Sequence, residues 1–443
     1  MKNRFVFSIL FLALAGNLVV GTHVYRVKAA TEENPEEKIR TFIHVLETVR
    51  SHYVDGDKVA YQKLVYSSLK GMIAALDPHS EFMEPPKYTA MKSDTRGAFG
   101  GIGVIITLRT NDAGKSVLTV SEPMDETPAA AAGIIANDQI IRIEGRSTIG
   151  FTIQDAVNKL RGKAGTKVTI TVFRREPSGK TKTWDVTLTR SVISVSPVRD
   201  WLGADEFPLD ENGIGYVRLR QFGEKTANHL EKALKKMEKS GMKALVLDLR
   251  DNPGGLLDQA VEVAGKFLPR GTLIVSTEAR NFEDREEYKS SGLHKHPNYK
   301  IAVLVNGGSA SASEIVAGCL QDLNRAVIIG ERTFGKGSVQ SILPLEDGSA
   351  LRLTTAKYYT PSHKVIHERG ISPDIRVSMS PETERLVALQ RMQADQDFLT
   401  DEEKEAVRNA KDPQMERARD MLKGLLLLNE EGKPAKKTAK NTH

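Results

Sequence analysis

Residues 306–340 contain the side chains with the clearest chemical potential in this sequence. Ser309, Ser311 and Ser313 alternate with alanines, and Lys336 follows further on between two glycines. A serine hydroxyl becomes a useful nucleophile only when a neighbouring base takes its proton. A lysine serves as that base when burial makes its ammonium form costly. The stretch therefore predicts a Ser-Lys hydrolase, with three serines as candidate nucleophiles.

The flanking segments predict how these residues are positioned. The apolar run 301–305 predicts a buried strand, and the apolar spacing over 312–323 predicts a helix. The serines then lie at a strand-to-helix turn, where the unpaired N–H groups of the helix start suit a developing oxyanion. Residues 326–330 predict the next strand, and Lys336 follows it in a loop.

Two other interpretations of the serines remain open. Ser311 and Glu314 have the spacing of a capping box, in which a helix-starting serine pairs with a glutamate three positions later. A Ser-His-Asp triad would instead use His363 or His367 with Asp374. No G-x-S-x-G elbow surrounds the serines, so nothing in the sequence favours this triad.

The lysine also lies in a pattern that resembles a phosphate-binding loop. Residues 330–336 read G-x-x-x-x-G-K after a predicted strand. Gly337 stands where such a loop needs Ser or Thr to hold magnesium, and residues 338–342 alternate like a strand where a helix should begin. These two departures from a phosphate-binding loop argue against nucleotide binding.

These motifs resemble those of the carboxyl-terminal processing peptidases, also called tail-specific proteases. The resemblance rests on Ser-Ala-Ser-Ala-Ser-Glu at 309–314, Phe-Gly-Lys-Gly at 334–337 with Gln340, and Leu-Asp-Leu-Arg-Asp-Asn-Pro-Gly-Gly at 247–255. Further similar segments lie at 76–80, 99–104 and 370–374, so the resemblance covers about residues 35–375. One departure is His363, where the family would have glycine.

The resemblance implies a role for each site residue. Ser311 corresponds to the nucleophile, Lys336 to the general base, and Gln340 to the residue that orients the lysine. The amides of Ala312 and Gly254 correspond to the oxyanion hole, with Gly255 as the less favoured substitute. The family needs no metal or other cofactor. Asp248 and Asp251 have no companion ligand cluster and are expected to be structural.

Composition excludes one class of function. The chain has 443 residues and a formal net charge of +6, but the two terminal segments, 1–30 and 432–443, each contain four basic and no acidic residues. The remaining body is slightly acidic, so it lacks the basic patch that nucleic-acid binding requires.

The amino terminus predicts export. Lys2 and Arg4 precede an apolar run over residues 5–21, which is typical of a secretory signal. Residues 1–30 are therefore expected to be a signal peptide or a membrane anchor, with the body in the periplasm or on the extracytoplasmic face of the membrane. Cys319 is the only cysteine, which rules out an intrachain disulfide.

The predicted architecture is an α/β multidomain protein. After residues 1–30, a helical region spans 31–95, a β-rich PDZ domain with two helices spans 97–188, and a crotonase-like α/β spiral protease core spans 190–377. A helical region over 380–430 and a lysine-rich disordered tail over 431–443 complete the chain.

The PDZ prediction brings a second site. Gly100-Gly101-Ile102-Gly103 is the candidate loop that holds a peptide carboxylate through backbone N–H groups, and Arg161 is a candidate contact to the same carboxylate.

The expected function is an exported serine endopeptidase that acts on protein substrates with free C-termini. An activating adaptor protein, a homodimer or higher oligomer, and membrane association through the amino terminus are expected partners. A non-catalytic PDZ adaptor on a protease-like core is the alternative.

Overall fold

The computed structural model describes residues 34–95, 98–110, 116–124, 127–175, 180–194, 196–292, 296–391 and 400–431. The predicted export segment and the lysine-rich tail lie outside these residues. The chain divides into two compact units, Met1–Phe82 and Met83–His443. Within the described residues, no helix combines the length and apolarity needed to cross a membrane.

The first unit is helical where apolar spacing predicts helices. It contains α2 (Pro35–His52), a short 3-10 helix η1 (Gly56–Lys58) and α3 (Tyr61–Ala74), and β1 (Glu81–Met83) crosses into the second unit. Asn34 caps α2 by accepting a hydrogen bond from Glu36 N at 3.1 Å. No residue of α2 is buried, and its apolar side chains include Ile39, Phe42 and Ile43, which are about half exposed.

The second unit begins with α4 (Pro85–Thr95) and continues into a β-rich region. Its elements are β2 (Ala98–Gly101), β3 (Val104–Thr110), β4 (Ser116–Pro123), α5 (Pro128–Ala131), β5 (Gln139–Ile143), β6 (Arg146–Ser147), α6 (Ile153–Leu160), β7 (Lys167–Arg175), β8 (Thr181–Thr189) and β9 (Ser191–Ser194). The main antiparallel sheet has the order β3-β4-β5-β7-β8, and β2 pairs with β9. Buried residues of β4, β5 and β7 form a core of their own.

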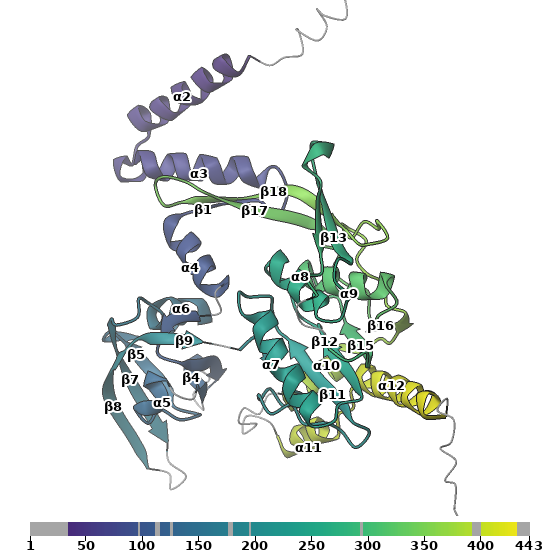
Figure 1. Cartoon of the computed structure of the whole chain (residues 1–443). Coiled ribbons are helices and arrows are strands. Elements are labelled where there is room, and N and C mark those ends of the chain that lie inside the picture. The colour runs from purple at the N-terminus through teal and green to yellow at the C-terminus, as the bar shows by residue number, and fades with distance from the viewer. Residues whose placement is uncertain are drawn as a thin grey trace, which may run out of the picture. The chain divides into compact units, whose positions relative to one another are not determined.

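A mostly parallel sheet forms the centre of the following region (Figure 1). Its strands, in spatial order, are β10 (Val198–Arg199), β11 (Ile214–Leu219), β12 (Ala244–Asp248), β15 (Lys300–Val305), β16 (Val327–Gly330) and β19 (Ile375–Arg376). Among these described strands, only the β10–β11 pair is antiparallel. Every residue of β12 is buried, as expected for a strand covered on both faces.

Helices cover both faces of this sheet. α7 (Thr226–Lys239), α8 (Leu257–Gly265) and α9 (Ala312–Asp322) share one core with residues such as Val217 and Leu247. α12 (Pro413–Glu431), the yellow helix in Figure 1, packs Met415, Ala418 and Leu422 against the opposite face. α10 (Pro381–Arg391) and α11 (Asp401–Asn409) precede it.

A second, antiparallel sheet accompanies the parallel one. It contains, in spatial order, the strands β17 (Ser338–Pro344), β18 (Ala350–Tyr359), β13 (Leu273–Ala279) and β14 (Glu286–Lys289). The 3-10 helix η2 (Phe282–Asp284) joins β13 to β14. The sequence predicts β17 but not the sheet to which it belongs. β17 matters for function because it follows the segment that contains Lys336.

Candidate active site

Three loops meet at one edge of the parallel sheet. We define the glycine turn as residues 251–255, the serine loop as 306–311 and the lysine loop as 331–337; they follow β12, β15 and β16, which are neighbours in the sheet. Carboxyl ends of parallel neighbours lie at the same edge, where sites in α/β folds usually form. The sheet therefore brings together three segments that are far apart in the chain.

The hydroxyls of the three alternating serines have different surroundings. Ser309 Oγ donates to Leu249 O at 2.8 Å, and Ser313 Oγ donates to Asn252 O at 2.9 Å. Both hydroxyls therefore fasten the serine loop and the start of α9 to the segment that follows β12. Ser311 differs, because its hydroxyl contacts the Tyr358 phenol.

The backbone of Ser311 is strained. Its φ is 55° and its ψ is −114°, a region that residues other than glycine seldom adopt, and the residue is 8% exposed. Such strain costs on the order of 1–3 kcal/mol and persists where the surrounding structure enforces it. The sharp turn places the Ser311 side chain beside the first amides of α9.

Glu314 links this strained serine to the lysine loop. Its Oε2 accepts from Ser311 N at 2.8 Å and from Lys336 N at 2.9 Å, and its Oε1 accepts from Gly335 N at 2.7 Å and from Thr333 Oγ1 at 2.5 Å. One carboxylate oxygen therefore joins the backbones of Ser311 and Lys336. Burial raises the pKa of the fully buried Glu314, while these four donors act in the opposite direction.

The predicted capping box of Ser311 and Glu314 is present at the start of α9. The Glu314 carboxylate accepts from Ser311 N, as the capping box requires. Glu314 N also donates to the Ser311 carbonyl oxygen at 2.8 Å. Ser311 and Glu314 are therefore joined through the backbone groups of the serine as well.

The glycine turn packs directly against the nucleophile candidate. A Cβ added to Gly254 would lie 2.8 Å from Ser311 Cβ and 2.9 Å from Ala312 N, and its φ is +99°. The Asn252 carbonyl accepts from Ala310 N and from Ser313 Oγ, on either side of Ser311. Gly254 N itself donates to Asn252 Oδ1 at 2.9 Å, so its amide must share or exchange this bond to contact an oxyanion.

The lysine loop is held on both sides of Lys336. Phe334 N donates to Ser309 O at 3.0 Å, which ties the lysine loop to the serine loop. Gly335 has a φ of +91°, and a Cβ on Gly337 would lie 2.1 Å from His367 N, so both glycines are required by the fold. Gln340 lies at the start of β17, where its Nε2 donates to Ser338 Oγ at 2.8 Å.

Tyr358 is a site residue that sequence reasoning missed. It lies near the end of β18, where its N–H donates to Gly337 O at 2.7 Å. Burial raises the pKa of its phenol to about 12, and a contact with the Ser311 hydroxyl partly offsets this rise. The phenol is therefore neutral over the usual pH range and faces the nucleophile candidate. Nothing in the sequence pattern of β18 distinguishes this tyrosine from its neighbour Tyr359.

The histidine and aspartate residues of the alternative Ser-His-Asp triad make other contacts. Asp374 accepts from Ile328 N at 2.8 Å and from Gln321 Nε2 at 2.7 Å, so both carboxylate oxygens hold β16 and α9 in place. His363 Nε2 pairs with Glu278 at 2.8 Å on an exposed turn. Among the described residues, neither His363 nor His367 is bonded to Asp374, and no group of three or more His, Cys, Asp or Glu side chains is arranged to hold a metal ion.

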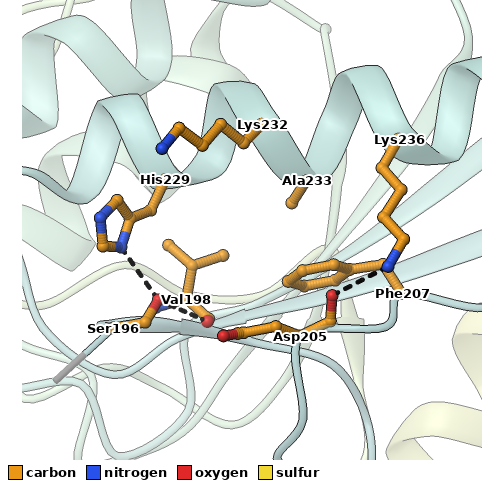
Figure 2. Close-up of a pocket in the computed structure, with 8 residues that line it drawn as sticks. All are labelled: Ser196, Val198, Asp205, Phe207, His229, Lys232, Ala233 and Lys236. Carbon is orange, nitrogen blue, oxygen red and sulfur yellow. Dashed lines mark hydrogen bonds between the residues drawn. The ribbon is translucent and has the colours of Figure 1, made fainter. Parts of the chain in front are cut away.

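A separate pocket contains another serine-histidine pair (Figure 2). The pocket has a volume of about 280 Å³ and lies between α7 and the segment around β10. Ser196 Oγ donates to Val198 O at 3.0 Å and contacts His229 Nδ1 at 2.9 Å. The Ser196 hydroxyl has a single proton, and Val198 O competes with His229 Nδ1 for it, so the histidine is not a dedicated base for this serine. Burial lowers the pKa of His229.

The predicted carboxylate-binding segment begins in a strand. Gly100 and Gly101 end β2, while Ile102 and Gly103 connect it to β3. The guanidinium of Arg161 lies 4.0 Å from the ring centroid of Phe99, so Arg161 is adjacent to this segment. α6 lies beside β3, and Ile105 on β3 and Ile153 on α6 expose 49% and 37% of their surface.

Comparison with known proteins decides the family. Residues 213–377 match peptidase family S41, and residues 119–174 match the PDZ domain. A carboxy-terminal-processing protease of Bartonella bacilliformis is 42% identical over 381 residues, which cover 85% of this chain and 83% of that protein. The chain belongs to peptidase family S41. The carboxy-terminal processing protease CtpA of Bacillus subtilis is 33% identical, over 84% of this chain and 75% of that protein.

The fold agrees with this assignment. A crystal structure of a candidate S41 protease from Bacteroides fragilis covers 82% of this chain and 96% of its own, with a TM-score of 0.50 and 17% identity. The resemblance to carboxyl-terminal processing peptidases, the α/β fold with a PDZ domain and the serine-protease activity are thus confirmed.

Proposed function

We propose that this S41 protease cleaves peptide bonds with a Ser311-Lys336 dyad and an acyl-enzyme intermediate. The observation that carries the proposal is the single Glu314 oxygen that accepts from both Ser311 N and Lys336 N. This oxygen fixes the two backbones side by side, although α9 and β16 lie between them in the chain. The Ser311 hydroxyl contacts the Tyr358 phenol, whereas the hydroxyls of Ser309 and Ser313 donate to backbone carbonyl oxygens. This difference supports the assignment of Ser311 as the nucleophile.

The chemistry follows from these positions. Neutral Lys336 takes the Ser311 proton as the hydroxyl attacks the substrate carbonyl, and the resulting ammonium protonates the leaving amine. Water then releases the acyl group by the same route. The amides of Ala312 and Gly254 hold the oxyanion, for which the close approach of Gly254 to Ala312 N is the support. The Gln340 amide oxygen is available to orient the lysine, because its Nε2 donates to Ser338.

Cleavage of casein or a tail peptide by the purified protein tests the dyad. Ser311→Ala and Lys336→Ala are expected to abolish turnover, while Lys364→Ala, which removes an exposed lysine paired with Asp322, serves as the matched control. Undiminished turnover in Ser311→Ala or Lys336→Ala would refute the dyad. Loss in His367→Ala without loss in Lys336→Ala would favour the triad.

Labelling with a fluorophosphonate separates the enzyme from the non-catalytic adaptor. The probe reacts with activated serines, so wild-type protein is expected to label at Ser311 and Ser311→Ala is not. Failure of the wild type to label, with peptide binding intact, would favour the adaptor.

Recognition of free C-terminal tails is the second part of the proposal. The neighbouring elements β3 and α6 expose Ile105 and Ile153, and Arg161 lies against Phe99 beside the Gly100–Gly103 segment. A peptide added along β3 would place its carboxylate near this segment. Amidating the C-terminus of a substrate is expected to slow cleavage by raising KM. Equal rates for the acid and amide forms would contradict this role.

Export and self-association complete the proposal. The basic and apolar residues of segment 1–30 support delivery to the periplasm or the outer face of the membrane, where envelope proteins are the expected substrates. A fusion of this segment to alkaline phosphatase should be active only if the segment directs export.

The half-exposed apolar side chains of α2 support a homodimer or higher oligomer, which sedimentation of Phe42→Asp beside wild type would test. An activating adaptor protein and contact of the amino terminus with the membrane remain parts of the same proposal.

A further inference from the structure

A buried network of charges lies immediately before the glycine turn. Arg250 forms a bidentate pair with Asp248, with Nη2 2.6 Å from Oδ2 and Nε 2.9 Å from Oδ1. Tyr216 donates to the same Asp248 Oδ2 at 2.6 Å. The Asp248 side chain is fully buried and that of Arg250 is 4% exposed. Burial alone would raise the pKa of Asp248, but Arg250 holds it below its ordinary range.

The same arginine reaches the C-terminal segment. Arg250 Nη1 lies 2.8 Å from Asp412 Oδ2 and donates to Gln414 Oε1 at 2.9 Å. Asp412 is 3% exposed and also pairs with Arg391 of α10 at 2.7 Å. Asp412 Oδ1 accepts from Met415 N at 3.0 Å, which anchors this aspartate at the start of α12. The helix that covers the far face of the sheet is thus bonded to the segment that leads into the active site.

A short chain of contacts leads from Arg250 to Ser311. Asp251 follows directly, with a φ of +58°, and its N–H donates to Asn306 Oδ1 of the serine loop. Asn252 comes next, and its carbonyl accepts from Ala310 N and Ser313 Oγ. The glycine turn therefore holds the serine loop on both sides of Ser311. Arg250, which is held by its ion pairs with Asp248 and Asp412, directly precedes this turn.

We propose that Asp412 is a positioning residue for the Ser311 site, because it fixes Arg250 and thereby the glycine turn. The inference rests on the proposed function of Ser311. It extends the site to residues beyond position 377, where the match to family S41 ends. Arg250 cannot leave the interior without breaking its pair with Asp248, and without Asp412 one side of its guanidinium loses its charged partner. The turn then shifts, and a displacement of about 1 Å costs on the order of 100-fold in rate.

Steady-state kinetics of Asp412→Asn test the proposal on the full chain. Asparagine keeps the shape and the acceptor for Met415 N but removes the charge that faces Arg250 and Arg391. The expected result is a fall in kcat of about 10- to 100-fold with KM changed less than about threefold, and an equally slower fluorophosphonate reaction. Asp412→Glu, which restores the charge, is expected to recover part of kcat.

Leu422→Ala provides the matched control for a purely structural role. Leu422 is a fully buried residue of the same α12, so its truncation loosens the helix without touching the Arg250–Asp412 pair. Its kcat should stay near wild type at a temperature at which both variants remain folded. Equal loss of kcat in Leu422→Ala and Asp412→Asn would overturn the proposal, as would wild-type kcat in Asp412→Asn. Turnover by Ser311→Ala, measured alongside, would instead refute the dyad itself.

Discussion

The contact between the glycine turn and Ser311, the proposed nucleophile, makes Gly254→Ala the most informative single substitution. The added methyl carbon would lie 2.8 Å from Ser311 Cβ and 2.7 Å from Ala310 O. Carbon atoms in contact prefer about 3.5–4.0 Å, so the turn and the serine loop must separate by roughly 1 Å. A displacement of that size in a reacting group is expected to lower kcat/KM about 100-fold.

A second cost arises from the backbone. The φ of Gly254 is +99°, and an alanine there is strained by about 1–3 kcal/mol whatever the space around it. Gly241 provides the matched control, because its φ is +90° and no atom lies within 4 Å of the position that an added Cβ would take. Gly241→Ala should therefore carry a similar backbone cost and keep its activity.

Peptide cleavage and urea unfolding, measured on both variants, separate the two costs. Gly254→Ala should unfold at a lower urea concentration than Gly241→Ala, because its added carbon also overlaps Ser311 and Ala310, and only Gly254→Ala should lose kcat/KM. If the two variants kept the same kcat/KM, the packing of the glycine turn against Ser311 would be irrelevant to catalysis, and the reasoning built on it would fail.

Three further predictions concern residues around the same site. Glu314→Gln replaces one carboxylate oxygen, which accepts two hydrogen bonds, with an NH2 group that donates. The free energy of unfolding, measured in urea, should therefore fall by about 3–6 kcal/mol. A fall of less than about 1 kcal/mol would contradict the bridging role of Glu314. Tyr358→Phe removes the phenol that contacts Ser311, and kcat should fall about three- to tenfold with KM unchanged; an unaltered kcat would show that the contact is incidental. Burial raises the pKa of the Cys319 thiol to about 12, so Ellman's reagent at a mildly alkaline pH should label it only after unfolding; rapid labelling of the folded protein would disprove its burial.

The elements that carry the site could be predicted because their sequences are strongly patterned. The apolar run 301–305 becomes β15 (Lys300–Val305), and the helical spacing over 312–323 becomes α9 (Ala312–Asp322). Strands buried on both faces consist almost entirely of apolar residues, so their position along the chain is clear. The order of strands then places three loops at one edge, and the residue types in those loops indicate acyl transfer.

The antiparallel sheet is harder to predict. β18 (Ala350–Tyr359) is half exposed over much of its length and contains Arg352, Thr354 and Lys357, so its alternation of apolar and polar residues is weak. Its partner β13 (Leu273–Ala279) lies far away in the chain, before β15, α9 and β16. Tyr358 is placed at the site by the pairing of β18 with both β17 and β13, and a single sequence does not reveal these pairings.

Long-range polar contacts are equally invisible in the sequence. The spacing of Ser311 and Glu314 predicts a glutamate that caps its own helix. Glu314 also accepts from the Thr333 hydroxyl and from the Gly335 and Lys336 amides of the lysine loop. Arg250 and Asp412 are 162 residues apart. Such pairs depend on which surfaces the fold brings together, and neither propensity nor periodicity carries that information.

The left-handed backbone of Ser311 has a consequence for the order of synthesis. Its conformation depends on residues that lie both before it, at 251–254, and well after it, at 333–336. A ribosome-bound chain that ends at the serine loop contains Ser311 but lacks the groups at 333–336 that hold its strained turn. Pairings between distant parts of a chain form slowly, because loop closure costs entropy before the contacts stabilise it. Under the proposed dyad, we therefore expect such an incomplete chain to lack protease activity.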